Sequence, residues 1–102
     1  MELSNVKKIS TLLQFAYKAH KLYFGESVII EMLSNKIKLV VLATDVSSSQ
    51  EKKYLNKTSY YGIPTIRILS KSELGDLFSK NEVACVGISD NNFAKEIKKL
   101  SM

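Results

Sequence analysis

The sequence predicts an α/β protein: a three-layer α/β/α sandwich around a small mixed sheet of about four strands. Segments with helical periodicity alternate with short apolar segments of strand length. Two of these segments, 39–43 and 83–88, are apolar throughout, as is typical of central strands covered on both faces. The length of 102 residues, the ordinary composition and the lack of a linker or repeat indicate a single domain over residues 1–102.

The N-terminal half is expected to hold two helices and a central strand. A first helix is predicted from Ser4 to about His20, and an extended segment at 21–24 ends at Gly25. The first helix has an apolar stripe made of Val6, Ile9, Leu13 and Ala16. A second helix is expected at about 26–34, followed by the strand at 39–43.

The C-terminal half begins with a third helix. Ser48 and Glu51 have the spacing of a capping box, so we expect them to open a helix that runs to about Tyr60. Gly62 and Pro64 interrupt the chain.

Segment 65–69 alternates between apolar and polar residues, which predicts a strand with one less buried face. Ser70 and Glu73 repeat the capping-box spacing and predict a short helix. After the strand at 83–88, Asp90 is expected to cap the last helix.

The charge balance allows an anionic partner. The formal net charge is +5 and the pI is near 9.3, values that suit nucleic acid but also suit solubility alone. No apolar run approaches the ~20 residues of a membrane span. The first ten residues lack the apolar core of a signal peptide, so we expect a cytoplasmic protein without a membrane partner.

The residues that usually carry catalysis are sparse. No glycine motif for cradling phosphates occurs, and Asp45 follows its strand without acidic neighbours. His20 and Cys85 are the only His and Cys, which excludes a disulfide and a cysteine-based zinc site. We interpret His20 as a surface or helix-cap residue and Cys85 as a buried thiol. The chain is therefore expected not to be an enzyme and to need no cofactor or metal.

Several segments together resemble a known family. They are Leu39 to Ser47, the lysine-rich helix after it, Tyr60 to Pro64, and Ser70 to Gly75. In order and spacing they resemble the kink-turn RNA-binding ribosomal protein family (L-seven-Ae type), most of all its short bacterial YlxQ-like branch. The similarity spans about Leu12 to Ile97. It implies an α/β/α sandwich in which two elements recognise a sharply bent RNA helix.

The first implied element is the turn into the second helix, where the family has Gly-x-Asn-Glu-x-x-Lys. Here Gly25, Glu26 and Ser27 begin the motif, with Ser27 at the Asn position. Val28 stands at the Glu position and Glu31 at the Lys position, so binding to a standard kink-turn is expected to be weak. Val28→Glu together with Glu31→Lys is expected to strengthen that binding.

The second implied element is the loop and helix start at Ser70, Lys71 and Ser72, which keep the family pattern together with Leu74 and Gly75. Backbone N–H groups at the starts of both helices are expected to receive phosphates. An apolar lip at 69–74 is expected to pack against an extruded base. The side chains of Lys21, Lys36 and Lys71 are expected to meet at one edge of the sandwich and attract RNA.

The resemblance predicts an RNA-binding protein that docks on structured RNA without chemistry, with ribosomal and regulatory RNA as candidate targets. The rival hypothesis is a protein-interaction or regulatory module that has kept the fold and lost standard kink-turn recognition. The altered motif from Gly25 to Glu31 is the main argument for the rival. A third hypothesis, a small-molecule enzyme on the same fold, lacks any catalytic constellation.

Overall fold

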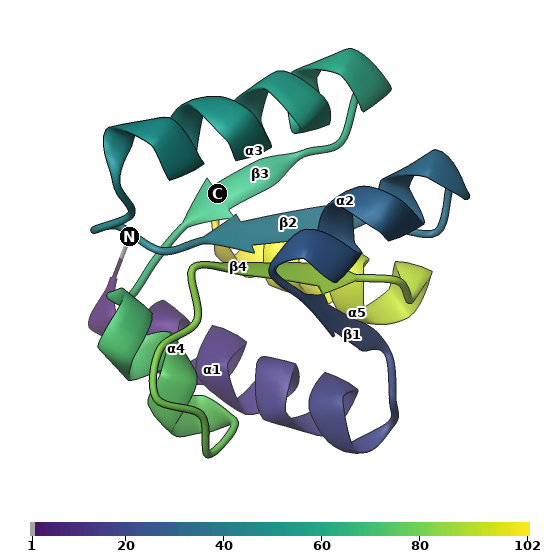
Figure 1. The fold of residues 1–102 in the computed structure, drawn as a ribbon. Coiled ribbons are helices and arrows are strands. Elements are labelled where there is room, and N and C mark those ends of the chain that lie inside the picture. The colour runs from purple at the N-terminus through teal and green to yellow at the C-terminus, as the bar shows by residue number, and fades with distance from the viewer. Residues whose placement is uncertain (1) are drawn as a thin grey trace.

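The computed structural model describes residues 2–102, which form five helices and four strands (Figure 1). In chain order these are α1 (Leu3–Lys18), β1 (Leu22–Phe24), α2 (Glu26–Leu33), β2 (Leu39–Leu42), α3 (Ser48–Tyr61), β3 (Thr65–Arg67), α4 (Lys71–Leu77), β4 (Cys85–Ile88) and α5 (Asn91–Leu100). Within residues 2–102, no helix has the length and hydropathy needed to cross a bilayer.

The four strands form one mixed sheet in the order β1-β4-β2-β3. Strand β4 runs antiparallel to β1 and β2, and β2 runs parallel to β3. Val41 lies opposite Val86 on one side and Ile66 on the other. The two apolar segments are therefore neighbouring central strands, and the predicted mixed sheet of four strands is confirmed.

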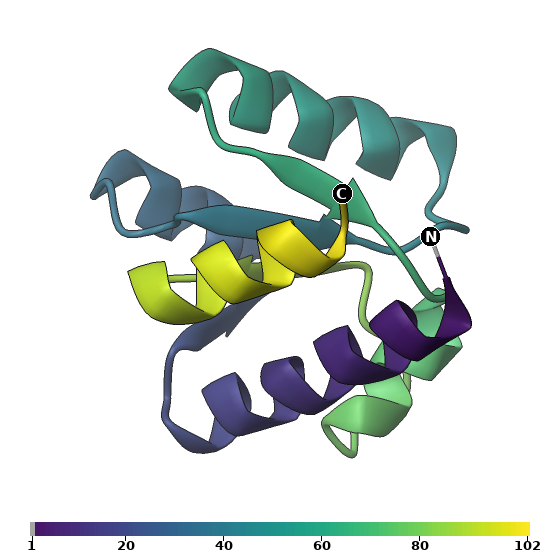
Figure 2. The same cartoon turned by 180° about the vertical axis from the view of Figure 1, so that it is seen from behind.

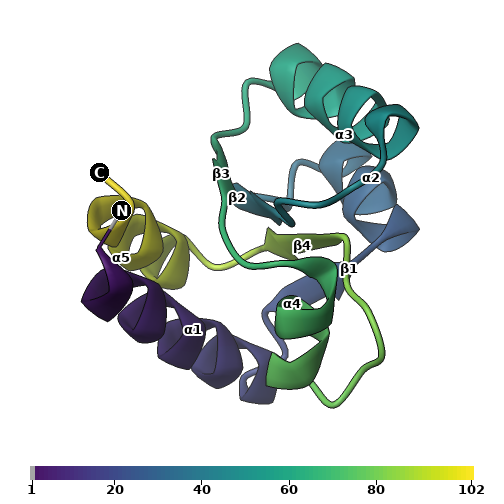
Figure 3. The same cartoon turned by 90° about the vertical axis from the view of Figure 1, so that its left-hand side faces the viewer.

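Helices cover both faces of this sheet. Figure 3 shows α2 and α3 on one side and α1, α4 and α5 on the other. Leu39 and Val41 of β2 join the core under α1, α4 and α5, whereas Val40 and Leu42 join the core under α2 and α3. Successive strand residues point to opposite faces, so a strand with two cores must be apolar at every position. The predicted three-layer sandwich is confirmed.

Several boundaries differ from the sequence prediction, two of them for a backbone reason. Helix α1 ends at Lys18 because His20 adopts a left-handed conformation (φ 59°) and the Lys21 N–H bonds back to the Ala16 carbonyl at 2.9 Å. Strand β3 stops at Arg67 because Leu69 turns the chain away with φ 62°. Strand β4 begins at Cys85, two residues later than predicted.

The capping prediction for α3 is wrong by one residue. Ser47 accepts the Gln50 N–H at 3.2 Å, and the Gln50 side chain accepts the Ser47 N–H at 3.2 Å. Glu51 is left outside the capping box and pairs with Arg67 instead. The predicted caps of α4 and α5, by Ser70 with Glu73 and by Asp90, are confirmed.

Candidate functional site

Strands β1, β2 and β3 run in the same direction and finish at one end of the sheet, where β4 begins. We call this the carboxyl end; the opposite end is the amino end. Figure 3 views the molecule from the carboxyl end. In open α/β sheets, ligands bind preferentially outside the carboxyl ends of strands.

Gly25 makes the turn from β1 into α2 at the carboxyl end. Its backbone has φ 57° and ψ −130°, a combination that residues with a side chain rarely adopt. The Gly25 N–H donates to the Cys85 carbonyl at 3.1 Å, which ties the turn to the start of β4. A Cβ at Gly25 would meet no atom within 4 Å, so the surface above the turn is open to a ligand.

The next two residues have local partners. The Ser27 hydroxyl donates to the Phe24 carbonyl at 2.6 Å and accepts the Phe24 N–H at 3.1 Å, so it fixes the turn. Glu26 forms an ion pair with Lys53 of α3. Within residues 2–102, no side chain caps the first turn of α2. The Val28 N–H donates to the Gly25 carbonyl at 3.0 Å, which leaves the N–H groups of Glu26 and Ser27 for a ligand.

The second segment, at the start of α4, is held by carboxylates. The Glu73 side chain accepts the Ser70 N–H at 2.8 Å, and the Ser70 hydroxyl accepts the Glu73 N–H at 3.1 Å. Asp45, from the loop after β2, accepts the Lys71 N–H at 2.8 Å. The expectation that this helix start offers its N–H groups to phosphate is therefore wrong for Ser70, Lys71 and Glu73. The Lys71 ammonium and the exposed Ser72 stay predicted contacts.

The predicted apolar lip is smaller than expected. Leu74 is fully buried and cannot touch a ligand, whereas Leu69 is half-buried. The Leu69 carbonyl accepts two hydrogen bonds from Thr44, at 2.8 Å from its N–H and 3.2 Å from its hydroxyl. These bonds hold Leu69 in its left-handed conformation at the carboxyl end.

One short stretch of chain joins the two segments. The Gly25 N–H binds the Cys85 carbonyl, and the Val83 N–H binds the Lys71 carbonyl at 3.0 Å. Val83 and Cys85 are two residues apart, so their Cα atoms are separated by at most about 7 Å. The fold thus brings Gly25, Glu26 and Ser27 beside Ser70, Lys71 and Ser72, although more than forty positions separate the two groups in the sequence.

Lys21 and Lys36 lie at the amino end, so the expectation that they meet Lys71 is wrong. The Lys21 carbonyl accepts the Ser89 N–H at 2.9 Å just beyond β4. Lys36 follows α2, and its Nζ lies 3.5 Å from Glu31 Oε2. The strand directions decide this outcome, because β1 and β2 both start at the amino end and these lysines precede them.

The proposed double substitution also needs correction. Val28 is fully buried in the core under α2, against Met32 and Cys85. It is not a surface position, and Val28→Glu would place a carboxylate among apolar side chains. Glu31 has a side chain 22% exposed and can be exchanged without entering the core.

Two cations at the carboxyl end were missed in the sequence. Lys80 Nζ lies 4.8 Å from the centre of the Phe24 ring at the end of β1. Arg67 binds Glu51 and the Thr44 carbonyl, the latter at 3.3 Å. The position of Arg67 at a strand end was a usable signal. Lys80 had no such signal in the sequence, because only the path of the loop after α4 brings it beside Phe24.

The two candidate reactive residues are placed as predicted. His20 is exposed and lies two residues after the end of α1, and Cys85 is fully buried. Burial raises the pKa of the Cys85 thiol to about 12, so it stays protonated near neutral pH. Residues 2–102 contain no group of three His, Cys, Asp or Glu side chains arranged to hold a metal ion.

The small mixed sheet between two helical layers defines an α/β/α sandwich, with the Gly25 and Lys71 segments side by side at its carboxyl end. The chain belongs to the ribosomal protein L7Ae/L30e/S12e/Gadd45 family, whose sequence model matches residues 7–98. The resemblance noted in the sequence is thereby confirmed.

Two relatives carry the name RNA-binding protein YlxQ. The one from Enterococcus faecium is 37% identical over 101 residues, covering 98% of this chain and 97% of that protein. The one from Bacillus subtilis (strain 168) is 34% identical over 90 residues, covering 87% of this chain and 90% of that protein. The YlxQ-like branch is therefore the part of the family to which the chain is similar.

Solved structures share the fold. A protein of unknown function from Bacillus halodurans C has a TM-score of 0.86 at 30% identity, covering 91% of this chain and 95% of that chain. A 15.5 kD RNA binding protein from Giardia lamblia has a TM-score of 0.79 at 15% identity, covering 99% and 88%. The second similarity concerns the fold alone.

Proposed function

We propose that this protein binds structured RNA at the carboxyl end of its sheet, in the cytoplasm, and docks on a sharply bent RNA helix without catalysis. Its family and the names of its relatives support RNA as the ligand. The observation that carries the proposal is the pairing of the Gly25 turn with the Lys71 segment through Val83 and Cys85. Two rigidly joined loops suit a ligand that presents two surfaces at an angle.

Each segment has its own role in this docking. The uncapped first turn of α2 offers N–H groups to a phosphate, and the open space above Gly25 lets the RNA backbone approach. Lys71 and Lys80 add attraction that does not depend on sequence. Leu69, the exposed part of the apolar lip, packs against an extruded base.

The departures from the family motif determine how tightly we expect the protein to bind a standard kink-turn RNA. The Ser27 hydroxyl is engaged by Phe24, and Glu31 puts a carboxylate where the family has a lysine. Both features weaken contacts to a standard kink-turn. We therefore propose a bent RNA target whose phosphates approach α2 at its first turn and avoid Glu31.

A titration of two RNAs tests this proposal. One RNA has two short helices joined by a sharp kink-turn bend, and the other is a straight duplex of the same length and base composition. Fluorescence anisotropy should show about tenfold tighter binding of the bent RNA at 0.1 M salt, because only the bend reaches both segments. Equal affinity for the two RNAs would contradict recognition of a bend.

A protein-interaction role on the same fold is the second candidate. It is favoured by the acidic groups at the carboxyl end, where Glu26, Asp45 and Glu73 all lie beside the candidate contacts. Carboxylates repel phosphate and accept hydrogen bonds from protein donors. This alternative predicts that neither RNA binds at the carboxyl end in the titration.

A further inference from the structure

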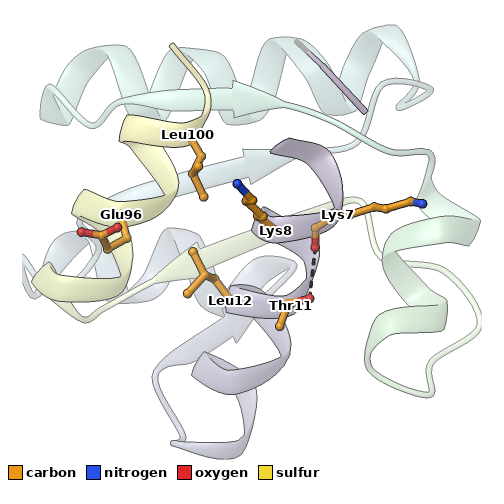
Figure 4. Close-up of a pocket in the computed structure, with 6 residues that line it drawn as sticks. All are labelled: Lys7, Lys8, Thr11, Leu12, Glu96 and Leu100. Atoms are coloured by element: carbon orange, nitrogen blue, oxygen red, sulfur yellow. Dashed lines mark hydrogen bonds between the residues drawn. The ribbon is translucent and has the colours of Figure 1, made fainter. Parts of the chain in front are cut away.

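Figure 2 shows the face of the molecule on which α1 and α5 run side by side. Two hollows are lined by residues of α5. The first has a volume of about 470 Å³ and lies between α1 and α5; its lining includes Lys7, Lys8 and Glu96 above Leu12 and Leu100. In Figure 4, the Lys8 side chain extends toward Leu100, whereas the Lys7 side chain points away from Leu12 and Leu100. The second has a volume of about 240 Å³ and lies on the other flank of α5.

The second hollow is lined by three lysines, Lys38, Lys95 and Lys98, with Pro64 at the start of β3. Across both hollows the charged lining residues are five lysines and one glutamate. We call the five lysines the basic strip: Lys7, Lys8, Lys38, Lys95 and Lys98. The strip crosses from α1, over α5, to the amino end of β2.

The lysines of the basic strip have no acidic partner within residues 2–102. The three ion pairs found there use Lys36, Lys53 and Arg67. At the carboxyl end, by contrast, Lys53 and Arg67 are paired and Asp45 lies against α4. The lining of the two hollows therefore has a local excess of positive charge, five lysines against one glutamate.

We propose that the basic strip is a second RNA-binding surface, which holds the phosphate backbone of a helical RNA arm. Lysine ammonium groups act as point charges and fit a backbone contact that reads no bases. The lysines lie on both flanks of α5 without an acidic partner, which matches a charged strand that passes across that helix. The inference rests on the proposed function in taking RNA as the ligand.

An acidic protein helix is a less suitable occupant. Such a helix needs one continuous apolar groove for its own apolar face. Here the apolar lining is divided: the half-buried Leu12 and Leu100 line the first hollow, Leu39, Pro64 and Ala94 line the second, and α5 lies between them. The lysines continue across both hollows.

The strip also specifies the length of the RNA. The molecule measures 31 × 28 × 25 Å. The strip lies beside α1 and α5, whereas the candidate site lies where β1, β2 and β3 finish. At about 3 Å of helix axis per base pair, an arm of roughly ten base pairs would pass from one surface to the other. A short bent RNA should therefore use the carboxyl end alone, and a long straight duplex should use the strip alone.

The test uses a straight RNA duplex of twenty base pairs, titrated by fluorescence anisotropy at several salt concentrations. Lys95→Gln with Lys98→Gln should lower affinity at least about tenfold at 0.1 M salt and reduce the salt slope by about two. The matched control is Lys52→Gln with Lys57→Gln, two exposed lysines of α3 with the same change in charge. The control should change affinity less than twofold.

Glu96→Gln should have the opposite effect and strengthen duplex binding, because it removes the only acidic group that lines the hollows. A gain of affinity cannot result from damage to the fold. Unchanged affinity in the Lys95 and Lys98 variant, or an equal loss in the α3 control, would overturn the proposal.

A peptide of ten glutamates, titrated in parallel, distinguishes the other class of partner. Loss of peptide binding without loss of duplex binding in the Lys95 and Lys98 variant would also overturn the RNA proposal. The proposed function is judged separately, by the ratio of affinities for short bent and straight RNA. A ratio of one with an intact strip effect would reject the proposed function and leave this inference standing.

Discussion

Lys71 combines a positive charge with a fixed backbone position at the carboxyl end. Its carbonyl accepts the Val83 N–H and its N–H donates to Asp45, so its backbone position is fixed from both sides. Lys71→Ala should weaken binding to many RNA sequences alike and lower the salt slope by about one phosphate contact. Stability should fall by less than about 0.5 kcal/mol.

The measurement for Lys71 is a salt series of binding curves for the short bent RNA, with Lys57→Ala on α3 as the control. Lys57 carries the same charge and is exposed on the other helical layer. Parallel salt lines for Lys71→Ala and the unmodified protein would remove Lys71 from the site.

Gly25 is expected to be required for its backbone conformation. Four non-glycine residues of this chain adopt φ near 60° (His20, Asn35, Leu69 and Ser79). Gly25 combines φ 57° with ψ −130°, outside the left-handed helical region. Gly25→Ala should therefore cost about 1–3 kcal/mol of unfolding free energy.

Gly62→Ala is the matched control in urea unfolding. Gly62 has φ 66° and ψ 33°, a left-handed conformation that an L-residue adopts at about 1 kcal/mol. If Gly25→Ala cost no more than Gly62→Ala, the special conformation of the turn would not be what requires glycine.

Because Val28 is buried, a substitution at Glu31 is the way to test the departure from the family motif in α2. Glu31→Lys removes a carboxylate from the second turn of α2 and should strengthen binding of a kink-turn RNA, with anisotropy as the measurement. Val28→Glu should instead destabilise the protein by several kcal/mol, because it buries a charge without a partner. Unchanged or weaker RNA binding by Glu31→Lys would show that α2 does not face phosphate there.

At the scale of the elements, Asp45 controls the start of α4. Its carboxylate accepts the Lys71 N–H, and it lies where a phosphate of the docked RNA is expected. Asp45→Asn keeps an oxygen acceptor and removes the negative charge. RNA affinity should rise about two- to fivefold at 0.1 M salt, while stability should fall by about 0.3–1 kcal/mol from the lost helix-dipole interaction.

Asp45→Asn is informative because RNA affinity should rise while the stability of the protein falls. Anisotropy gives the affinity and urea unfolding gives the stability of the same preparation, with Asp76→Asn, a substitution within α4, as the control. A fall in RNA affinity for Asp45→Asn would mean that Asp45 positions the RNA-binding loop more than it repels RNA.

The elements themselves could be predicted because each signal is local. The stripe with Ile9 and Leu13 and the fully apolar β2 depend on residues close in sequence. The cap of α3 was misplaced because Ser47 with Gln50 and Ser48 with Glu51 have the same spacing. Local pattern could not choose between two equivalent capping pairs.

At the scale of the whole molecule, the composition of the site could be predicted only in part. The resemblance indicated Gly25 and Lys71, and the fold brings their segments together. The sequence misplaced Lys21 and Lys36 because strand direction, which depends on long-range pairing, decides which end of the sheet each loop reaches. For the same reason it missed Lys80 at the carboxyl end and the basic strip on the α1–α5 face.

The central claim is that RNA docks at the carboxyl end, and amide chemical shifts measure this most directly. In a ¹⁵N–¹H NMR titration with the short bent RNA, shifts should concentrate at residues 25–27, 69–72 and 83–85. These stretches form one surface held together by the hydrogen bonds of Gly25 and Val83. Shifts confined to α3 or to the amino end, with these three stretches unchanged, would contradict the account.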